Sequence, residues 1–313
     1  MKVENYVTLE FLSRSTNEAF ARTAAAAFAA QLDPTLDEVG DIRTAVSEAV
    51  TNAIVHAYPD KLGKIVMKGA NPVLDEPDAE AAIPIHAFLL DTPEGCILFD
   101  AGCHPKAMEG AWPPELCGNP YVTGPGENLP DQLARIGVDP GRITKVVLSH
   151  LHLDHAGGVH LFPQADVYVH QRELEQVMSD AAAGTLDLFH VQCDVDSWKA
   201  AGTRWVPVSA DAGETPLCPG VTILNLGPGH SFGMLGLSVE LDCGTFLLVA
   251  DAAYCREHFG PPAKLSGAVV DQEGYFAAME YLRRYAAEHH AQILFGHDME
   301  QFRTLKKPPE YYA

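Results

Sequence analysis

The sequence predicts a layered α/β protein, and three observations indicate this. Short apolar runs of strand type alternate with helix-type stretches from about residue 63 to the end of the chain. Several of these runs end in Asp or His. The first 60 residues follow a different pattern, a short strand and then two helices. We therefore expect a small N-terminal segment, residues 1–60, and a larger α/β domain over residues 61–313.

Composition limits the classes of function. The chain has 313 residues, of which 47% are hydrophobic, which is enough for a sizeable core. Its seven cysteines are odd in number and lack C-x-x-C spacing, so we expect no disulfide framework and a reducing, cytoplasmic location. The net charge of −21 argues against nucleic acid as a partner, and no long apolar run predicts a membrane span. A homodimer is left open.

The N-terminal segment shows the signals of two helices. Ser15 with Glu18, and Thr35 with Glu38, have the S/T-x-x-E spacing of a capping box. The second helix has apolar residues at steps of three and four, which predicts one buried stripe made of Leu36, Val39, Ile42, Val46, Val50 and Ile54.

Nine strand-type runs follow in the larger domain: KIVMK, IHAFLL, CILFD, KVVLSH, DVYVH, VTILNL, GLSVEL, TFLLVAD and AQILFG. Helices are expected at 131–137, 171–180 and 272–288, the last capped by Asp271. We place KIVMK, residues 64–68, at the edge of the larger domain's sheet. A chain beginning near Tyr58 is therefore expected to keep the site, and one beginning near Ile83 is not expected to fold.

The segment VVLSHLHLDHAGG carries the main functional signal. A β-branched strand leads to His150, and His152 follows two residues later on the same side of an extended chain. Asp154 and His155 come next, before two glycines. Imidazole and carboxylate are ligands of zinc, manganese, iron or cobalt at hydrolytic sites. Four such residues within six positions predict a metal site.

Three more candidate ligands follow strand-type runs further along the chain. His230 lies in GPGHSFG, Asp251 ends TFLLVAD, and His297 follows ILFG. Each is weak evidence alone, because a single polar residue after a strand is commonly an ordinary hydrogen-bonded side chain. Together with the first four they make the seven ligands of a two-metal site.

These motifs resemble the metallo-β-lactamase superfamily. More narrowly, SHLHLDHAGG, the DAAY at 251–254 and FGHDMEQF resemble the quorum-quenching N-acyl-homoserine lactonases. GHSFGMLGLSVEL and FGPPAKLSG, which hold no further ligand beyond His230, add to the likeness, which runs from about residue 64 to the C-terminus. The resemblance implies an αββα sandwich, here with a small N-terminal helical extension.

The resemblance also assigns roles to the ligands. One ion is assigned to three histidines, which are His150, His152 and His230. The second ion is assigned to Asp154, His155 and His297, and Asp251 is expected to bridge the two. Two divalent ions per chain are expected, zinc first, with iron, cobalt or manganese as alternatives.

The implied reaction is opening of the lactone ring of an N-acyl-homoserine lactone by a hydroxide that bridges two metals. Asp154 is expected to transfer the proton to the leaving oxygen, and Tyr254 to reach the substrate carbonyl. Asp100 matches the superfamily's strand-end aspartate, although a turn-forming role explains its sequence context equally well. Apolar candidates for an acyl channel are Leu151, Leu153, Trp112 and Phe232.

The alternatives come from two classes. A glyoxalase II-like thioester hydrolase uses a similar ligand set, and only Tyr254 and the terminal GHD favour the lactonase. Residues 1–60 resemble the start of the sporulation anti-sigma factor kinases, members of the GHKL ATPase group, with Glu48 and Asn52 at the positions that help hold Mg-ATP. The D-x-G-x-G loop those kinases need is absent, so we expect no working ATPase and keep a protein-binding module as the alternative.

Overall fold

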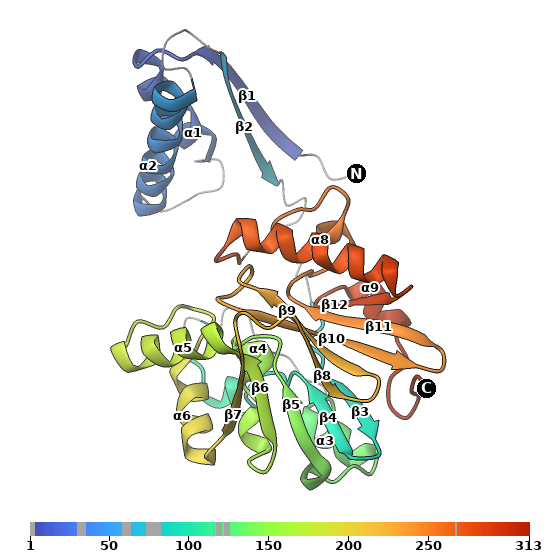
Figure 1. The fold of residues 1–313 in the computed structure, drawn as a ribbon. Coiled ribbons are helices and arrows are strands. Elements are labelled where there is room, and N and C mark those ends of the chain that lie inside the picture. Colours follow the sequence, from blue (N-terminus) through green and yellow to red (C-terminus); the bar gives the residue numbers. More distant parts are fainter. Residues whose placement is uncertain are drawn as a thin grey trace. The chain divides into compact units, whose positions relative to one another are not determined.

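The structure is a computed structural model of the chain and describes residues 4–29, 36–57, 64–72, 83–114, 116, 121, 126–266 and 268–313. The chain divides into two compact units, Met1–Ala81 and Ala82–Ala313. Both are drawn in Figure 1. The N-terminal unit ends at Ala81, beyond the boundary expected at residue 60.

The N-terminal unit consists of β1 (Glu4–Leu12), α1 (Thr16–Ala29), α2 (Leu36–Asn52), a π-helical turn (Ala53–Ala57) and β2 (Lys64–Pro72). β1 and β2 pair antiparallel along their whole lengths, with Leu12 opposite Lys64 and Glu4 opposite Pro72. This pairing corrects the expectation for KIVMK. Those residues form the start of β2, whose ladder is made with β1 in a separate two-stranded sheet, and not with a strand of the larger domain.

The two helices of this unit are joined by polar and apolar contacts. The Glu18 carboxylate accepts a hydrogen bond from the Ser47 hydroxyl on α2 and pairs with Arg22, so it connects the two helices. On α2, Val50 is buried, and the predicted stripe is its least exposed face, with partly buried Val39, Ile42, Val46 and Ile54. The second capping box falls on Thr35, which lies outside the described residues.

The second unit contains two five-stranded sheets (Figure 1). One runs in chain order through β3 (Phe88–Thr92), β4 (Gly95–Phe99), β5 (Ile143–Val147), β6 (Asp166–His170) and β7 (Arg204–Val208). Its strands are parallel from β4 onward. The other has the order β12 (Gln292–Phe295), β11 (Gly244–Ala250), β10 (Met234–Leu241), β9 (Val221–Gly227) and β8 (Glu214–Cys218).

The α-helices of this unit are α3 (Leu129–Arg135), α4 (Leu153–Ala156), α5 (Gln171–Ala183), α6 (Gln192–Ala201), α7 (Arg256–Phe259), α8 (Gln272–Glu288) and α9 (Met299–Thr304). The three expected helices are confirmed, and Asp271 caps α8 by accepting from the Gly274 N–H at 2.9 Å. The sequence reading missed α6, β7 and β8. Among the described residues, none of the helices is long and apolar enough to cross a membrane.

Alternating side chains of the strands build three apolar layers. In β4, Ile97 and Phe99 face the other sheet, and Cys96 and Leu98 face the helices. The helix-side layer of the first sheet includes residues of α3, α5 and α6, namely Leu133, Val177, Val195 and Trp198. On the other side, α8 packs on the second sheet through Tyr275, Met279, Leu282 and Tyr285. Helix, sheet, sheet and helix layers confirm the predicted αββα sandwich.

Candidate metal centre

The loop after β5 carries four of the predicted ligands. The chain leaves the buried strand at Val147 and passes through His150 and His152 into the single helical turn of α4, which contains Asp154 and His155. A close backbone contact holds this turn in place: the Ala101 N–H donates to the His155 carbonyl at 2.7 Å. A Cβ on Gly158 would lie 2.2 Å from the Ala101 carbonyl oxygen, so only glycine allows this approach.

The second sheet supplies the other three ligands from the ends of its strands. His230 lies between β9 and β10, Asp251 directly follows β11, and His297 follows β12 after one glycine. That residue, Gly296, passes so close to β11 that a Cβ would lie 2.7 Å from the Ala250 carbonyl carbon. Because β11 and β12 are parallel neighbours, their ends bring Asp251 and His297 to the same edge.

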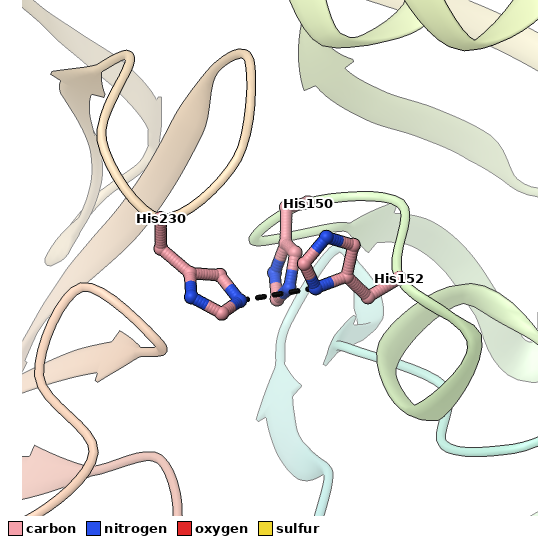
Figure 2. Close-up of side chains that lie close together, drawn as sticks. All are labelled: His150, His152 and His230. Carbon is pink, nitrogen blue, oxygen red and sulfur yellow. Dashed lines mark hydrogen bonds between the residues drawn. The ribbon is translucent and has the colours of Figure 1, made fainter. Parts of the chain in front are cut away.

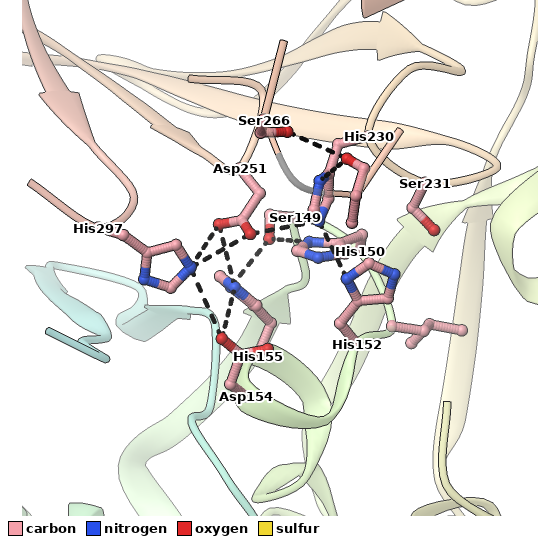
Figure 3. Close-up of polar contacts among 12 residues, drawn as sticks. Ser149, His150, His152, Asp154, His155, His230, Ser231, Asp251, Ser266 and His297 are labelled. Carbon is pink, nitrogen blue, oxygen red and sulfur yellow. Dashed lines mark hydrogen bonds and ion pairs between the residues drawn. The ribbon is translucent and has the colours of Figure 1, made fainter. Parts of the chain in front are cut away.

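The seven predicted ligands converge on one cluster, in which six are buried and Asp154 is partly buried (Figure 3). Nε2 of His230 lies 3.0 Å from Nδ1 of His152, and His150 completes a group of three histidines (Figure 2). A second group contains Asp154, His155 and His297. Oδ2 of Asp154 lies 3.5 Å from Nε2 of His155 and 3.6 Å from Nε2 of His297.

Asp251 lies between the two groups (Figure 3). Its Oδ1 is 3.1 Å from Nε2 of both His155 and His297, and its Oδ2 is 3.2 Å from Nε2 of His230. Oδ2 also lies 3.2 Å from Nε2 of His297, so the carboxylate contacts members of both groups. Such a position allows one carboxylate to serve two ions.

An unpaired nitrogen in the cluster fits metal binding. Nε2 of His150 is buried and makes no hydrogen bond among the described residues, while Nε2 of His155 and Oδ1 of Asp251 lie 3.1 Å apart inside the cluster. A buried polar atom without a partner costs free energy of about 1–3 kcal/mol, so its presence needs an explanation. All seven side chains present nitrogen or carboxylate oxygen, and these are the donor types that zinc and similar divalent ions accept.

The opposite ring nitrogens of the ligands are held by the protein. Nδ1 of His230 bonds the Ala268 carbonyl at 2.7 Å, and Nδ1 of His297 bonds the Pro84 carbonyl at 2.9 Å. Nδ1 of His155 lies 2.8 Å from Asp100. These contacts leave Nε2 of each ring directed into the cluster, which is the orientation that metal-binding histidines commonly have.

Burial and charge act differently on the two groups. Burial holds the pKa of His150 and of His152 well below the usual range, so both are neutral imidazoles at pH 7. Burial also opposes protonation of His297, yet the Asp251 carboxylate outweighs it and raises the pKa to about 9. In His155, burial is likewise outweighed by Asp154 and Asp251, and the pKa is raised well above its usual range. Divalent ions would replace these protons.

Tyr254 lies beside the cluster. Its ring contacts those of His230 and His297, with centroids 5.4 and 5.0 Å apart, so it is next to one ligand of each group. Burial, followed by the charge of Asp251, raises its pKa, so the hydroxyl stays protonated near neutral pH. A protonated phenol can donate a hydrogen bond to an oxygen atom at the site.

The four apolar candidates for an acyl channel lie in different surroundings. Trp112 and Leu153 share an apolar cluster with Cys103, Ala107 and Val191. Leu151 is wrong as a channel residue, because it is 1% exposed and packs in the core between the first sheet and its helices. Phe232 is partly buried and stacks on His190 at 5.8 Å between centroids.

Sequence reasoning missed several residues that support the cluster. Ser149 donates its N–H and hydroxyl to Asp100, at 2.7 and 2.9 Å. The Pro84 and Ala268 carbonyls carry no side-chain signal, so no motif could reveal them. His190 has its ring centroid 4.8 Å from that of the candidate ligand His152.

Residues 82–297 match the family described as Metallo-beta-lactamase superfamily, and this region is more than half of the chain. The chain belongs to the metallo-beta-lactamase superfamily. Its membership agrees with the αββα layers and with the class of metal-dependent hydrolase predicted from the ligand motif.

Within this superfamily, the chain is similar to N-acyl homoserine lactonases. It is 40% identical over 229 residues to N-acyl homoserine lactonase AiiB of Agrobacterium fabrum, covering 72% of this chain and 83% of the relative. It is 32% identical over 247 residues to N-acyl homoserine lactonase AttM of Azorhizobium caulinodans, covering 75% of this chain and 89% of the relative.

Solved structures give the same relationship. An N-acyl homoserine lactone hydrolase with the product N-hexanoyl-L-homoserine bound at its catalytic metal centre has a TM-score of 0.60 and 27% identity, over 74% of this chain and 87% of that one. A variant of AiiA from B. thuringiensis with N-decanoyl-L-homoserine bound has a TM-score of 0.60 and 25% identity, over 84% and 93% of the two chains.

The N-terminal unit of this metallo-beta-lactamase superfamily member has different relatives. Residues 11–87 match the family described as Histidine kinase-like ATPase domain. An anti-sigma F factor of Caldanaerobacter subterraneus is 62% identical over 68 residues, which are 22% of this chain and 48% of that protein. The chain therefore spans about half the length of these relatives, and the predicted resemblance of the N-terminus is confirmed.

Proposed function

We propose that the protein hydrolyses the lactone ring of N-acyl-homoserine lactones, the reaction of quorum quenching. The observation that carries the proposal is the position of Tyr254, whose ring lies against one histidine of each candidate metal group. A hydroxyl at this point can donate to a carbonyl oxygen held at the cluster. The names of the similar proteins, N-acyl homoserine lactonases, support the same substrate class.

Two divalent ions, zinc first and iron, cobalt or manganese as alternatives, are proposed as cofactors. One set would be His150, His152 and His230, and the other His155, His297 and Asp154, with Asp251 bridging. When bound, such ions lower the pKa of water enough to supply hydroxide as the nucleophile, here shared by both ions, and polarise a carbonyl. The match between these donor types and those ions supports the assignment.

The chain's own residues then direct the proton and the carbonyl oxygen. Asp154 is the most exposed of the seven, with 20% of its side chain accessible, so its carboxylate can exchange a proton with substrate. Asp154 would take the proton released when water becomes hydroxide. Hydroxide would then add to the ester carbonyl carbon, the ring C–O bond would break, and the alkoxide would take that proton from Asp154. Tyr254 donates to the carbonyl oxygen as negative charge develops there. The product is the open-chain hydroxy acid.

The deciding experiment combines metal analysis of the purified protein with a pH-drop assay on homoserine lactones of short and long acyl chain. Two ions per chain, together with lactone hydrolysis that a chelator removes and added zinc restores, support the proposal. One ion per chain at full activity contradicts the dinuclear assignment. Hydrolysis of S-lactoylglutathione without lactone hydrolysis assigns the protein to the glyoxalase II-like alternative.

For the N-terminal unit we propose that it does not work as an ATPase. Glu48 and Asn52 lie exposed on α2, but the chain spans about half of its anti-sigma F factor relatives and lacks the D-x-G-x-G loop. A protein-binding role is the alternative that the same likeness supports. Calorimetric titration of the full chain with Mg-ATP tests the proposal, and measurable binding contradicts it.

We propose a cytoplasmic location and leave open whether the protein forms a homodimer. The described cysteines, Cys96, Cys103, Cys193, Cys218, Cys243 and Cys255, are free thiols, as expected of a reducing cytoplasm. Cys117 lies outside the described residues. Sedimentation equilibrium distinguishes a homodimer from a monomer.

A further inference from the structure

The first turn of α5 contains a carboxylate that the proposed reaction does not use. Glu173 is the third residue of this helix, and it is fully buried, at 0% exposure. A carboxylate removed from water is costly unless hydrogen bonds or opposite charges compensate it. The groups that donate hydrogen bonds to the Glu173 carboxylate therefore indicate its role.

The Glu173 carboxylate binds two loops that come from different sheets. Its Oε1 accepts from the Leu151 N–H at 2.8 Å, in the loop after β5. Its Oε2 accepts from the Gly233 N–H at 3.1 Å, in the loop between β9 and β10. The Ser231 hydroxyl lies within hydrogen-bond distance of both oxygens, at 2.9 and 2.8 Å.

These donors are the sequence neighbours of three ligands. Leu151 lies between His150 and His152, and Ser231 directly follows His230. The two loops meet where Nε2 of His230 lies 3.0 Å from Nδ1 of His152 (Figure 2). One carboxylate thus joins the backbone segments that carry all three members of the histidine group.

A second contact of Glu173 leads to the same group. Nε2 of His190 lies 3.4 Å from Glu173, and its Nδ1 lies 2.8 Å from Asp187. The His190 ring is held between these two carboxylates and stands edge to face against His152, with an interplanar angle of 69°. Phe189, the preceding residue, stacks on the same ligand ring at 5.0 Å. His152 is therefore packed from behind by a segment that Glu173 helps to anchor.

The other candidate ion has a different support. Asp100 binds His155 and Ser149, and no hydrogen bond among the described residues connects it to Glu173. The Ser149 hydroxyl also lies 2.9 Å from Nδ1 of His150, so Asp100 contacts His155 directly and is linked to His150 through Ser149, whereas Glu173 contacts only segments of the three-histidine group.

We propose that Glu173 is a positioning residue for the three-histidine site, holding His150, His152 and His230 in the arrangement that binds one of the two ions. The inference rests on the proposed dinuclear function. It implies that loss of Glu173 weakens one ion selectively, because only one of the two ligand groups loses its anchor.

Glu173→Gln is the direct test. The amide keeps the size of the side chain but replaces one acceptor oxygen by a donor, which then faces N–H or O–H donors of Leu151, Ser231 or Gly233. Glu175→Gln is the matched control, since Glu175 lies exposed on the same helix. Ser231→Ala is a milder second variant, which removes one donor and leaves the carboxylate in place.

The measurement uses the full chain in three steps. Zinc content is determined, zinc affinity is measured by competition with a chromogenic chelator, and the d–d absorption of cobalt added stepwise to the metal-free protein reports the geometry of each site. Melting temperatures of the metal-free proteins separate a folding defect from a binding defect.

We expect Glu173→Gln to weaken one of the two ions about 10- to 100-fold and to change one set of cobalt bands, with a smaller effect in the same direction for Ser231→Ala. The control should match the wild type. Equal weakening of both ions, or wild-type affinity for both in a folded variant, overturns the inference. If Glu173→Gln does not fold, Ser231→Ala decides in the same way. Wild-type protein that binds fewer than two ions contradicts the proposed function itself and the inference with it.

Discussion

Oδ2 of Asp100 lies 2.8 Å from Nδ1 of His155, and both side chains are buried. Asp100 also accepts from the N–H and hydroxyl of Ser149, so its two oxygens are fully engaged. The contact holds a proton on Nδ1 and directs Nε2 toward Asp154 and Asp251. The backbone of Asp100 has a φ of 60°, in the left-handed region, which aspartate tolerates better than most residues.

Asp100→Asn should lower the affinity of the ion assigned to Asp154, His155 and His297 by about 10- to 100-fold, because the amide offers one acceptor where the carboxylate offers two. Chelator competition measures this affinity. Asp211→Asn, at an exposed loop position, is the control. An Asp100 variant with unchanged affinity for both ions shows that the carboxylate is only a turn former.

Asp251→Asn should weaken both ions together. Asp251 is within 3.2 Å of a histidine in each group, and no other ligand has this position among the described residues. Metal content after dialysis and the rate of lactone opening should both fall. Asp242→Asn, on the exposed turn between β10 and β11, should retain both. If Asp251→Asn keeps its full metal content and its full rate of lactone opening, Asp251 is not the residue that bridges the two ions.

Tyr254→Phe should reduce turnover of lactones about ten-fold to a few hundred-fold, the effect of losing one transition-state hydrogen bond. Its metal content should stay at the wild-type value, since Tyr254 packs on the ligand rings and is not counted among the ligands. Tyr281→Phe controls for loss of a hydroxyl, because Tyr281 bonds Glu214 outside the site. A normal turnover number in Tyr254→Phe removes the tyrosine from the mechanism.

A chain beginning at Ala82 should fold, bind two ions and keep most of its lactonase activity. Both five-stranded sheets and all seven ligands lie within Ala82–Ala313. This revises the expectation for a start near Ile83, which depended on the incorrect placement of strand 64–68. A chain beginning at Phe88 is the comparison, because it lacks the Pro84 carbonyl that accepts from His297. Circular dichroism and metal content distinguish the chain that begins at Ala82 from the chain that begins at Phe88. An unfolded Ala82 chain refutes the prediction.

Asp194→Asn should raise the melting temperature at neutral and alkaline pH but not at pH 4. Asp194 is 1% exposed, and burial raises its pKa from 3.8 to about 7. The unfolded chain therefore loses the proton first, and ionisation destabilises the folded state increasingly between about pH 4 and pH 7. A neutral asparagine escapes this penalty, which is at most about 4 kcal/mol.

The Asp194 comparison is made on metal-free protein by thermal unfolding at pH 4 and pH 8. The variant should exceed the wild type by a few degrees at pH 8 and match it at pH 4. Asp196→Asn, an exposed position on the same helix, should show no such pH dependence. A difference between Asp194→Asn and wild type that is the same at both pH values would mean that packing, and not ionisation, is responsible.

The sequence by itself determined the layered α/β class and the set of seven candidate ligands, and its resemblance to the metallo-β-lactamase superfamily implied the αββα order. A continuous apolar run such as CILF, residues 96–99, is typical of a central strand that is buried on both faces, and the structure places Ile97 and Leu98 on opposite faces. The H-x-H-x-D-H spacing carries four ligands within one loop. These are local patterns, in which the residues that act together are close in the chain, so they can be recognised without knowing how the chain folds.

Only the tertiary structure decided how distant segments support the site. Glu173 reaches Ser231 across 58 positions of the chain, and His297 reaches the Pro84 carbonyl across 213. A backbone carbonyl has no sequence signature, and a glutamate in the first turn of a helix is ordinarily a solvated residue. The partner of strand 64–72 was undetermined for the same reason. Its apolar pattern is compatible with any sheet edge, and pairing with β1 depends on which segment the fold brings beside it.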